Sequence, residues 1–327
     1  MRKTMTPTLW TCALLLAAGT ASAQDNVSTV QQIGDGNSAL ITQPGSRNSS
    51  AGTQTGDGNA LTVNQGGSLH TASAVQTGNR NTITQDQQGA NSRMEATQLG
   101  NRNDISQKQS IGPVNDEKAR QTGNRNLITQ EQIGSGHKAE ATQTGNDNVA
   151  DQLQQGRVNE GLVLQVGDQN EASQLQQGLG NQASITSLGN RNTSTQTQGG
   201  TNEANGLQVG NANRLTQSQQ GSLNEANATQ LGNRNVARQR QDEGNPSFNL
   251  ATIEQEGNDN RAIQNQGGTL AAQNTAYIDQ DGNDHEARQQ QTGILNSAQT
   301  YQGSSGQYSS TMQDGMNNTV VVKQNHP

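Results

Sequence analysis

Residues 32–43 read QIGDGNSALITQ, and this stretch decides the fold because its spacing recurs along the chain. The pattern is Gln-x-Gly-x-x-Asn-x-Ala-x-x-x-Gln, and the closing Gln opens the next copy eleven residues later. Counting from Gln32 to Gln324 gives 26 copies, with Gln in every opening position except Ser187 and Asn in 21 of the Asn positions. Self-similarity of this kind predicts stacked structural repeats.

The complete period is two copies long. Even-numbered copies place a small or apolar residue four positions after the Asn, such as Ala96 or Ile185. Ten consecutive odd-numbered copies place Gln there: Gln85, Gln107, Gln130, Gln152, Gln174, Gln196, Gln217, Gln239, Gln264 and Gln289. The unit is therefore 22 residues with two unlike halves, and there are 13 units.

Alternation within each copy predicts one β-strand with one buried face. The 52 positions that share a face with Asn and Gln hold a single charged residue, Glu117, whereas the 78 interleaved positions hold 25 charges. The x-Gly-x-x segment is the expected turn, because Gly adopts positive φ without cost. The sequence thus predicts an all-β fold. It is a β-solenoid of about 13 two-strand rungs forming two facing, parallel, in-register sheets, one rich in inward Gln and the other in Ala, Ile and Val.

Amide side chains are expected to hold the rungs in register, since each one both donates and accepts hydrogen bonds. A stacked pair gains about 1 kcal/mol, and a buried amide out of register costs more than that. The predicted ladder comprises the ten Gln residues above together with Gln32, Asn37, Gln43, Gln54, Asn59, Asn318 and Gln324.

The composition alone is typical of a disordered chain, since hydrophobic residues make up 27% and aromatic residues 2%. The regular spacing argues against disorder, which gives no reason to keep residue types in register. The charge is mildly acidic: without Arg2 and Lys3, 18 basic residues face 27 acidic ones, a net charge of −9. No nucleic-acid partner is expected, because such a protein needs a basic face.

The chain begins with the features of an export signal over residues 1–23. Arg2 and Lys3 precede an apolar run, and Ala21-Ser22-Ala23 forms a cleavage site. A short leader is expected over residues 24–31, the repeats over 32–324, and a tail over 325–327. The run is too short to span a bilayer, and no later segment is apolar enough to do so. The only Cys, Cys12, lies in the signal, so the exported chain has no thiol.

The repeat resembles the curlin repeat of bacterial curli subunits, with clean instances at Gln32, Gln165, Gln219 and Gln255. The resemblance implies a secreted subunit that polymerises outside the cell into cross-β amyloid fibres for adhesion and biofilm matrix. It also implies export through an outer-membrane pore and templating by a related nucleator subunit.

The last strand independently favours polymerisation. Residues 318–324 form the most apolar strand, with Val320 and Val322 on its inward face, and no capping segment is recognisable at either end of the array. Open sheet edges of one pattern invite end-to-end addition of further copies.

Two other classes of function compete with a fibre subunit. For an enzyme, His70, His137 and His285 are the candidate residues, but all three occupy the Asn position in distant rungs, so no catalytic, metal or cofactor site is expected. The alternative function is a monomeric, capped solenoid that acts as an adhesin or binds ice or another ligand. That function needs one outward residue type repeated on every rung, and the outward positions vary freely.

Overall fold

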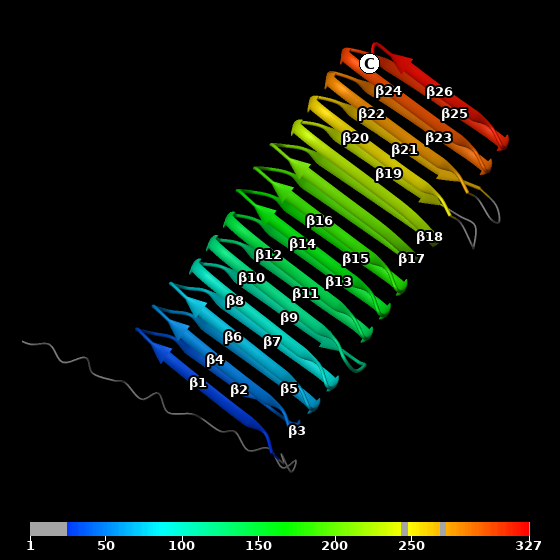
Figure 1. The fold of residues 1–327 in the computed structure, drawn as a ribbon. Helices are drawn as coiled ribbons and strands as arrows, with labels where there is room; N and C mark the ends of the chain where they lie inside the picture. The colour runs from blue at the N-terminus through cyan, green and yellow to red at the C-terminus, as the bar shows by residue number, and fades with distance from the viewer. Residues whose placement is uncertain (1–24, 243–247, 269–272, 327) are drawn as a thin grey trace, which may run out of the picture.

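The computed structural model describes residues 25–242, 248–268 and 273–326, and every regular element in them is a β-strand. The expected export signal, residues 1–23, lies outside the described residues. The strands form a straight column of two facing sheets, and the chain passes back and forth between them (Figure 1).

The sheets are named by their inward side chains. The Ala-rich sheet contains β1 (Val27–Ile33), β4 (Ser49–Thr55), β6 (Thr71–Thr77), β8 (Arg93–Asn101), β10 (Asp116–Asn124), β12 (Lys138–Asn146), β14 (Glu160–Val166), β16 (Gln182–Leu188), β20 (Leu250–Asn258), β22 (Thr275–Asn283), β24 (Ser297–Ser305) and β26 (Thr319–Gln324). The Gln-rich sheet contains β2 (Ser38–Thr42), β3 (Gly45–Ser46), β5 (Ala60–Ser68), β7 (Thr82–Ala90), β9 (Asp104–Ser110), β11 (Leu127–Ser135), β13 (Val149–Arg157), β15 (Glu171–Leu179), β19 (Val236–Asp242), β21 (Arg261–Gly267), β23 (Glu286–Ile294) and β25 (Tyr308–Met316). Two long strands, β17 (Thr193–Val209) and β18 (Arg214–Asn233), run through a turn and contribute to both sheets.

Every pairing between strands is parallel and in register with the repeat. Gln121 of β10 pairs with Gln143 of β12, and Gln130 of β11 pairs with Gln152 of β13. The longer repeats keep the same register. Gln230 pairs with Gln255 across a separation of 25 residues, and the extra residues lie between strands. The predicted β-solenoid with two parallel, in-register sheets is therefore confirmed.

The strands are longer, and the turns tighter, than the sequence suggested. Nine-residue strands such as β8 and β10 run on through the turn Gly, and Gly100 pairs with Gly123 one rung later. The Gly is required by this close stacking: at Gly145, φ is +123° and an added Cβ would lie 2.0 Å from the carbonyl oxygen of Gly167. A second residue of most described turns, such as Arg102, also has positive φ.

The strand ladder also begins earlier than expected. The segment predicted as a leader, residues 24–31, contributes to β1, which pairs with β4 from Val27 to Ile33. The physical reason is that Asn26, Ser28, Val30 and Gln32 already have the inward spacing of an Ala-rich strand. The strand pairing of the column therefore begins before Gln32, at Val27.

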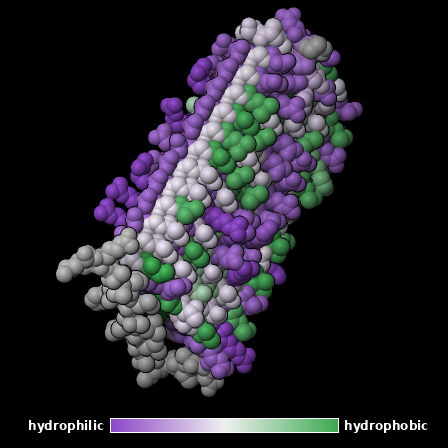
Figure 2. Space-filling view, turned by 60° about the vertical axis from the view of Figure 1, so that its left-hand side comes forward, coloured by the Kyte–Doolittle hydropathy of each residue, from purple (hydrophilic) through white to green (hydrophobic). Residues whose placement is uncertain are grey.

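The core between the sheets is thin and divides into apolar clusters and amide columns. Fourteen buried residues, including Ile83, Ile105 and Ile185, form one apolar cluster, and a second one includes Leu215 and Ile253. Outward side chains are mixed in character, and Figure 2 shows hydrophilic and hydrophobic groups interspersed on the visible sheet face. No helix in the described part of the chain is long and apolar enough to cross a membrane.

Candidate self-assembly site: amide ladders and open edges

The central Gln column lies on the Gln-rich sheet and is buried throughout. Nε2 of each Gln donates to Oε1 of the Gln one rung later, at 2.8–3.2 Å from Gln85 through Gln289. The other Nε2 hydrogen is donated to a backbone carbonyl of the facing sheet, as from Gln130 to Lys118 at 3.1 Å. Each amide therefore ties its rung to the next rung and to the opposite sheet.

The central column ends where the repeat changes. Val63 precedes Gln85, and the buried Oε1 of Gln85 has no partner in the described part of the chain. At the other end Gln289 donates to the hydroxyl of Thr300 at 3.0 Å, because Thr311 replaces Gln in the following rung. Both ends of the column are thus explained by residue type.

Two further Gln columns lie where the strands end. On the Ala-rich sheet, bonds join Gln32 to Gln54 at 2.5 Å and continue to Gln165, then resume from Gln208 to Gln324. Ser187 interrupts this column because its side chain is too short to reach the preceding Gln. On the Gln-rich sheet the column from Gln43 to Gln313 is continuous.

Asn holds the turns together, through two contacts with the following rung. The backbone N–H of Asn59 donates to Oδ1 of Asn37 at 2.9 Å, and Nδ2 of Asn37 donates to the carbonyl of Gly56 at 2.7 Å. Asn59 repeats the second contact with Gly78 at 2.8 Å, and the N–H of Asn318 donates to Asn296 at 3.1 Å. A side chain that both accepts and donates at this position is therefore part of the repeat.

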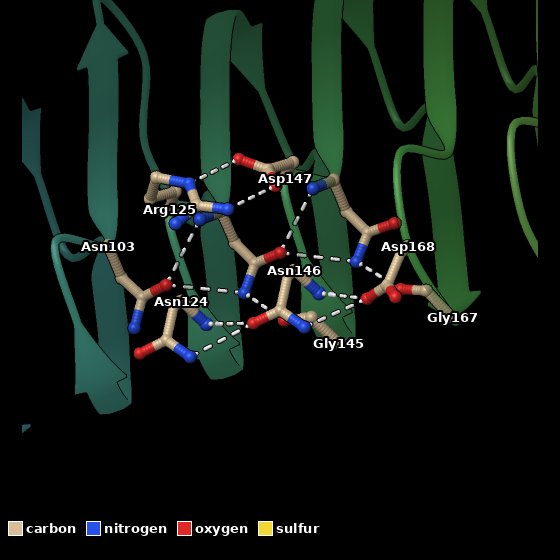
Figure 3. A network of polar contacts seen from close by, with 10 residues as sticks. Asn103, Asn124, Arg125, Gly145, Asn146, Asp147, Gly167 and Asp168 are labelled. Carbon is tan, nitrogen blue, oxygen red and sulfur yellow. Dashed lines mark hydrogen bonds and ion pairs between the residues drawn. The ribbon is translucent and has the colours of Figure 1, made fainter.

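A second Asn ladder runs through the turns themselves (Figure 3). Nδ2 of Asn124 donates to Oδ1 of Asn146 at 2.9 Å, and Asn146 donates in the same way to Asp168 at 3.0 Å. Beside this ladder Arg125 pairs with Asp147 through two bonds of 2.6 Å.

The three His residues in the Asn position act as Asn substitutes. Nδ1 of His137 accepts the N–H of Asn159 at 3.2 Å, and its Nε2 lies 3.2 Å from the carbonyl of Ile133. His70 and His285 make the equivalent contacts. In His70 and His137 these contacts require a neutral ring with its proton on Nε2, and burial lowers the pKa of both rings accordingly. Within the described ranges, no cluster of three or more His, Cys, Asp or Glu residues could hold a metal ion.

Glu117 is a charged residue at an inward position of the Ala-rich sheet, as its place in the repeat indicated. It is fully buried, stacked in register between Met94 and Ala139, and neither carboxyl oxygen has a partner among the described residues. Burial raises its pKa well above the ordinary value, and the charges of Glu131 and Asp116 add to this effect.

The end strands leave one edge each without a partner in the described part of the chain. At the C-terminal end β26 pairs with β24 and β25 pairs with β23. Val320 and Val322 of β26, which would be buried in an interior strand, are only half-buried. At the other end β1 pairs with β4, and β2 pairs with β5.

The C-terminal residues turn away from this edge. His326 pairs with Asp279 of β22 at 3.2 Å, and Asn325 passes over Gly303, so that a Cβ there would lie 2.4 Å from the Asn325 oxygen. The tail therefore folds back along the column, and the outer edge of β26 remains uncovered by it.

The fold and these ladders define a class: a repeat β-solenoid held together by amide columns. Residues 34–67 match the family described as Curlin associated repeat, so this part of the chain carries that repeat. No curated protein matches the chain. The strand register and amide bonds of the matched segment continue through the described residues as far as Gln324.

Proposed function

We propose that this chain is a secreted structural subunit that self-assembles into extracellular cross-β fibres of the curli type. The observation that carries the proposal is the continuity of the amide columns up to end strands whose outer edges have no partner among the described residues. The match of residues 34–67 to the curlin repeat supports the same class of protein.

The hydrogen bonds give the column a direction that suits end-to-end growth. Along the Ala-rich sheet each Gln donates towards the C-terminal end, so Gln32 presents an acceptor oxygen at one end and Gln324 a donor nitrogen at the other. A second copy added in the same direction brings the Gln324 donor to the Gln32 acceptor. Head-to-head addition would place donors against donors, so growth is polar.

The ends are complementary in one sheet and offset in the other. The Ala-rich sheet has the first and the last strand of the column, β1 and β26, whereas the Gln-rich sheet begins with β2 and ends with β25. Joining β26 to β1 of the next copy therefore leaves one strand position open between β25 and β2 of that copy. The joint is therefore held mainly by β26 and β1, and the open position is flanked by two Gln-rich strands.

The fibre would serve adhesion and biofilm matrix at the cell surface. Its partners would be further copies of itself, a related nucleator subunit and an outer-membrane secretion pore, as the curlin repeat implies. The irregular outward face gives less support to a monomeric ligand-binding solenoid.

Seeded assembly tests the proposal. The chain from Gln24 is diluted from denaturant with and without sonicated fibres of the same chain, and assembly is followed by light scattering and electron microscopy. Unbranched fibres and a lag phase abolished by seeds are expected. A protein that stays monomeric and rich in β-structure would contradict the proposal.

A further inference from the structure

Three arginines occupy the same turn position in consecutive rungs. Arg80, Arg102 and Arg125 have φ of 57°, 57° and 55°, so their backbones present the side chains in the same way. Backbone bonds hold the turns in register, from Arg102 to Asn79 at 2.9 Å and from Arg125 to Asn101 at 3.0 Å. The arginines therefore form a row along one edge of the column, with a spacing of about 4.8 Å per rung.

Two ion pairs at this turn position, one at the end of the row and one further along the column, show what such an arginine binds. Arg125 is followed one rung later by Asp147, and Nε and Nη2 of its guanidinium each hold one carboxylate oxygen at 2.6 Å (Figure 3). Arg234 holds Asp259 with the same two atoms, at 2.7 and 2.5 Å. An arginine here thus binds a carboxylate that lies one rung ahead through a two-pronged contact.

Arg80 and Arg102 are each followed by another arginine instead of an acid. Within the described residues neither has an ion-pair partner, and like charges one rung apart repel one another. A carboxylate bound between successive arginines would replace this repulsion with the geometry already seen at Arg125.

The arginine row lines an open groove with a second row of amides. Its lining comprises Asp57, Gly58, Asn79, Arg80, Asn101, Arg102, Asn124 and Arg125. Asn79, Asn101 and Asn124 are stacked by bonds of 3.0 and 3.1 Å, so the groove has a charged row beside a neutral row of amides. Figure 2, which brings the left-hand edge of Figure 1 forward, shows hydrophilic side chains along that edge.

We propose that this groove binds a linear acidic polysaccharide that carries one carboxylate on each sugar. The guanidinium groups of Arg80 and Arg102 hold successive carboxylates, and the amide row faces the sugar hydroxyls. A nucleic acid fits less well, because a duplex carries one negative charge for every ~1.7 Å of its axis, a denser line of charge than one carboxylate on each sugar. Asp57 at one end of the amide row, Asp147 at one end of the arginine row, and a net charge of −7 also disfavour a dense polyanion.

Binding of polygalacturonate oligomers to the purified chain tests this assignment. The Arg80→Gln, Arg102→Gln double variant should bind at least ten-fold more weakly than the unaltered chain. The single variant Arg102→Asp should also lose binding, because its carboxylate would occupy the guanidinium of Arg80. Methyl-esterified oligomers, which lack the charges, should not bind the unaltered chain.

A matched control distinguishes binding in this groove from a general effect of the positive charge of two arginines. Arg120→Gln with Arg191→Gln removes the same charge from an outward strand position and from a turn without a neighbouring arginine, and should leave binding unchanged. Equal losses in both double variants would overturn the proposal. Tighter binding of an oligonucleotide than of polygalacturonate, abolished by the Arg80 and Arg102 changes, would also overturn it. The assay uses unassembled chain, so its outcome is independent of fibre formation.

Discussion

Nε2 of Gln130 donates a 2.8 Å hydrogen bond to Oε1 of Gln152 one rung later, and both side chains are buried. Replacing both by Lys puts two like charges into the core and breaks the column on either side. We expect a loss of about 3–5 kcal/mol in the free energy of unfolding, the usual cost of an uncompensated buried charge. Fibre elongation should slow strongly, because the incoming rungs fold less readily.

The matched control for this pair lies on the same two strands. Leu127 and Val149 are register partners that face outward, and replacing both by Lys adds the same charge outside the core. Guanidinium unfolding followed by circular dichroism should show a change within about 0.5 kcal/mol for this control. Equal losses for the two double variants would show that the Gln130 column is not the element that stabilises the rungs.

Glu117→Ala should stabilise the chain in a pH-dependent way. Because burial raises the Glu117 pKa, the folded chain keeps a proton that the unfolded chain loses above the ordinary value of 4.5. Stability is therefore lost as pH rises above 4.5, and the substitution removes this loss. At pH 7 the gain should be about 1–3 kcal/mol, the cost of a buried polar group without a partner.

The check is to measure unfolding of both chains between pH 4 and pH 8. The two curves should converge near the acid end and separate as pH rises. A constant difference over this range would mean that Glu117 does not titrate on unfolding.

His70 and His137 should make the chain sensitive to mild acid. Burial lowers the pKa of both rings below the ordinary value of 6.5, so the unfolded chain binds more protons than the folded one between these values. Their stabilisation is complete above about pH 6.5 and is lost as pH falls through this window. Protonation at Nδ1 would also turn the acceptor of the next rung's N–H into a donor.

The double variant His70→Asn, His137→Asn tests this account, since Asn is the usual residue at both positions. Its stability should change less than that of the unaltered chain between pH 7 and pH 5. Identical pH dependence of the two chains would rule out these rings as the source of acid sensitivity.

A chain that begins at Gln32 should elongate faster than one that begins at Gln24. Without β1 the outermost strand at this end is β2, so β25 can pair with β2 and β26 with β4 of the next copy, and no strand position stays open. Elongation rates from identical seeds would be compared. Slower growth of the shorter chain would identify β1 itself as an essential joining strand.

The sequence predicted most of this fold because each rung repeats the same pattern of inward amide and apolar side chains. Alternation placed Ile105 and Gln107 inward, and the need to satisfy buried amides fixed the register that Gln107 and Gln130 show. The role of His137 as an Asn substitute also followed from its position in the repeat.

Three features escaped the sequence analysis, each for a physical reason. The strand β1 was missed because no Gly turn precedes Asn26, although its inward spacing was already present. Strands continue through Gly100 because stacked backbones pair even where φ is positive. The arginine row was visible in the Gly-Asn-Arg-Asn turns at Gly78, Gly100 and Gly123, but its meaning depends on the Arg125–Asp147 geometry, which the sequence does not show.

Fibre diffraction from aligned fibres of the chain from Gln24 is the most direct test of end-to-end assembly. End-to-end stacking predicts a meridional reflection near ~4.7 Å from the rung spacing and an equatorial one near ~10 Å from the distance between sheets. A seedable fibre with both reflections is the expected result. Fibres without a meridional reflection near ~4.7 Å, or a chain that remains monomeric, would contradict stacking of these solenoids end to end.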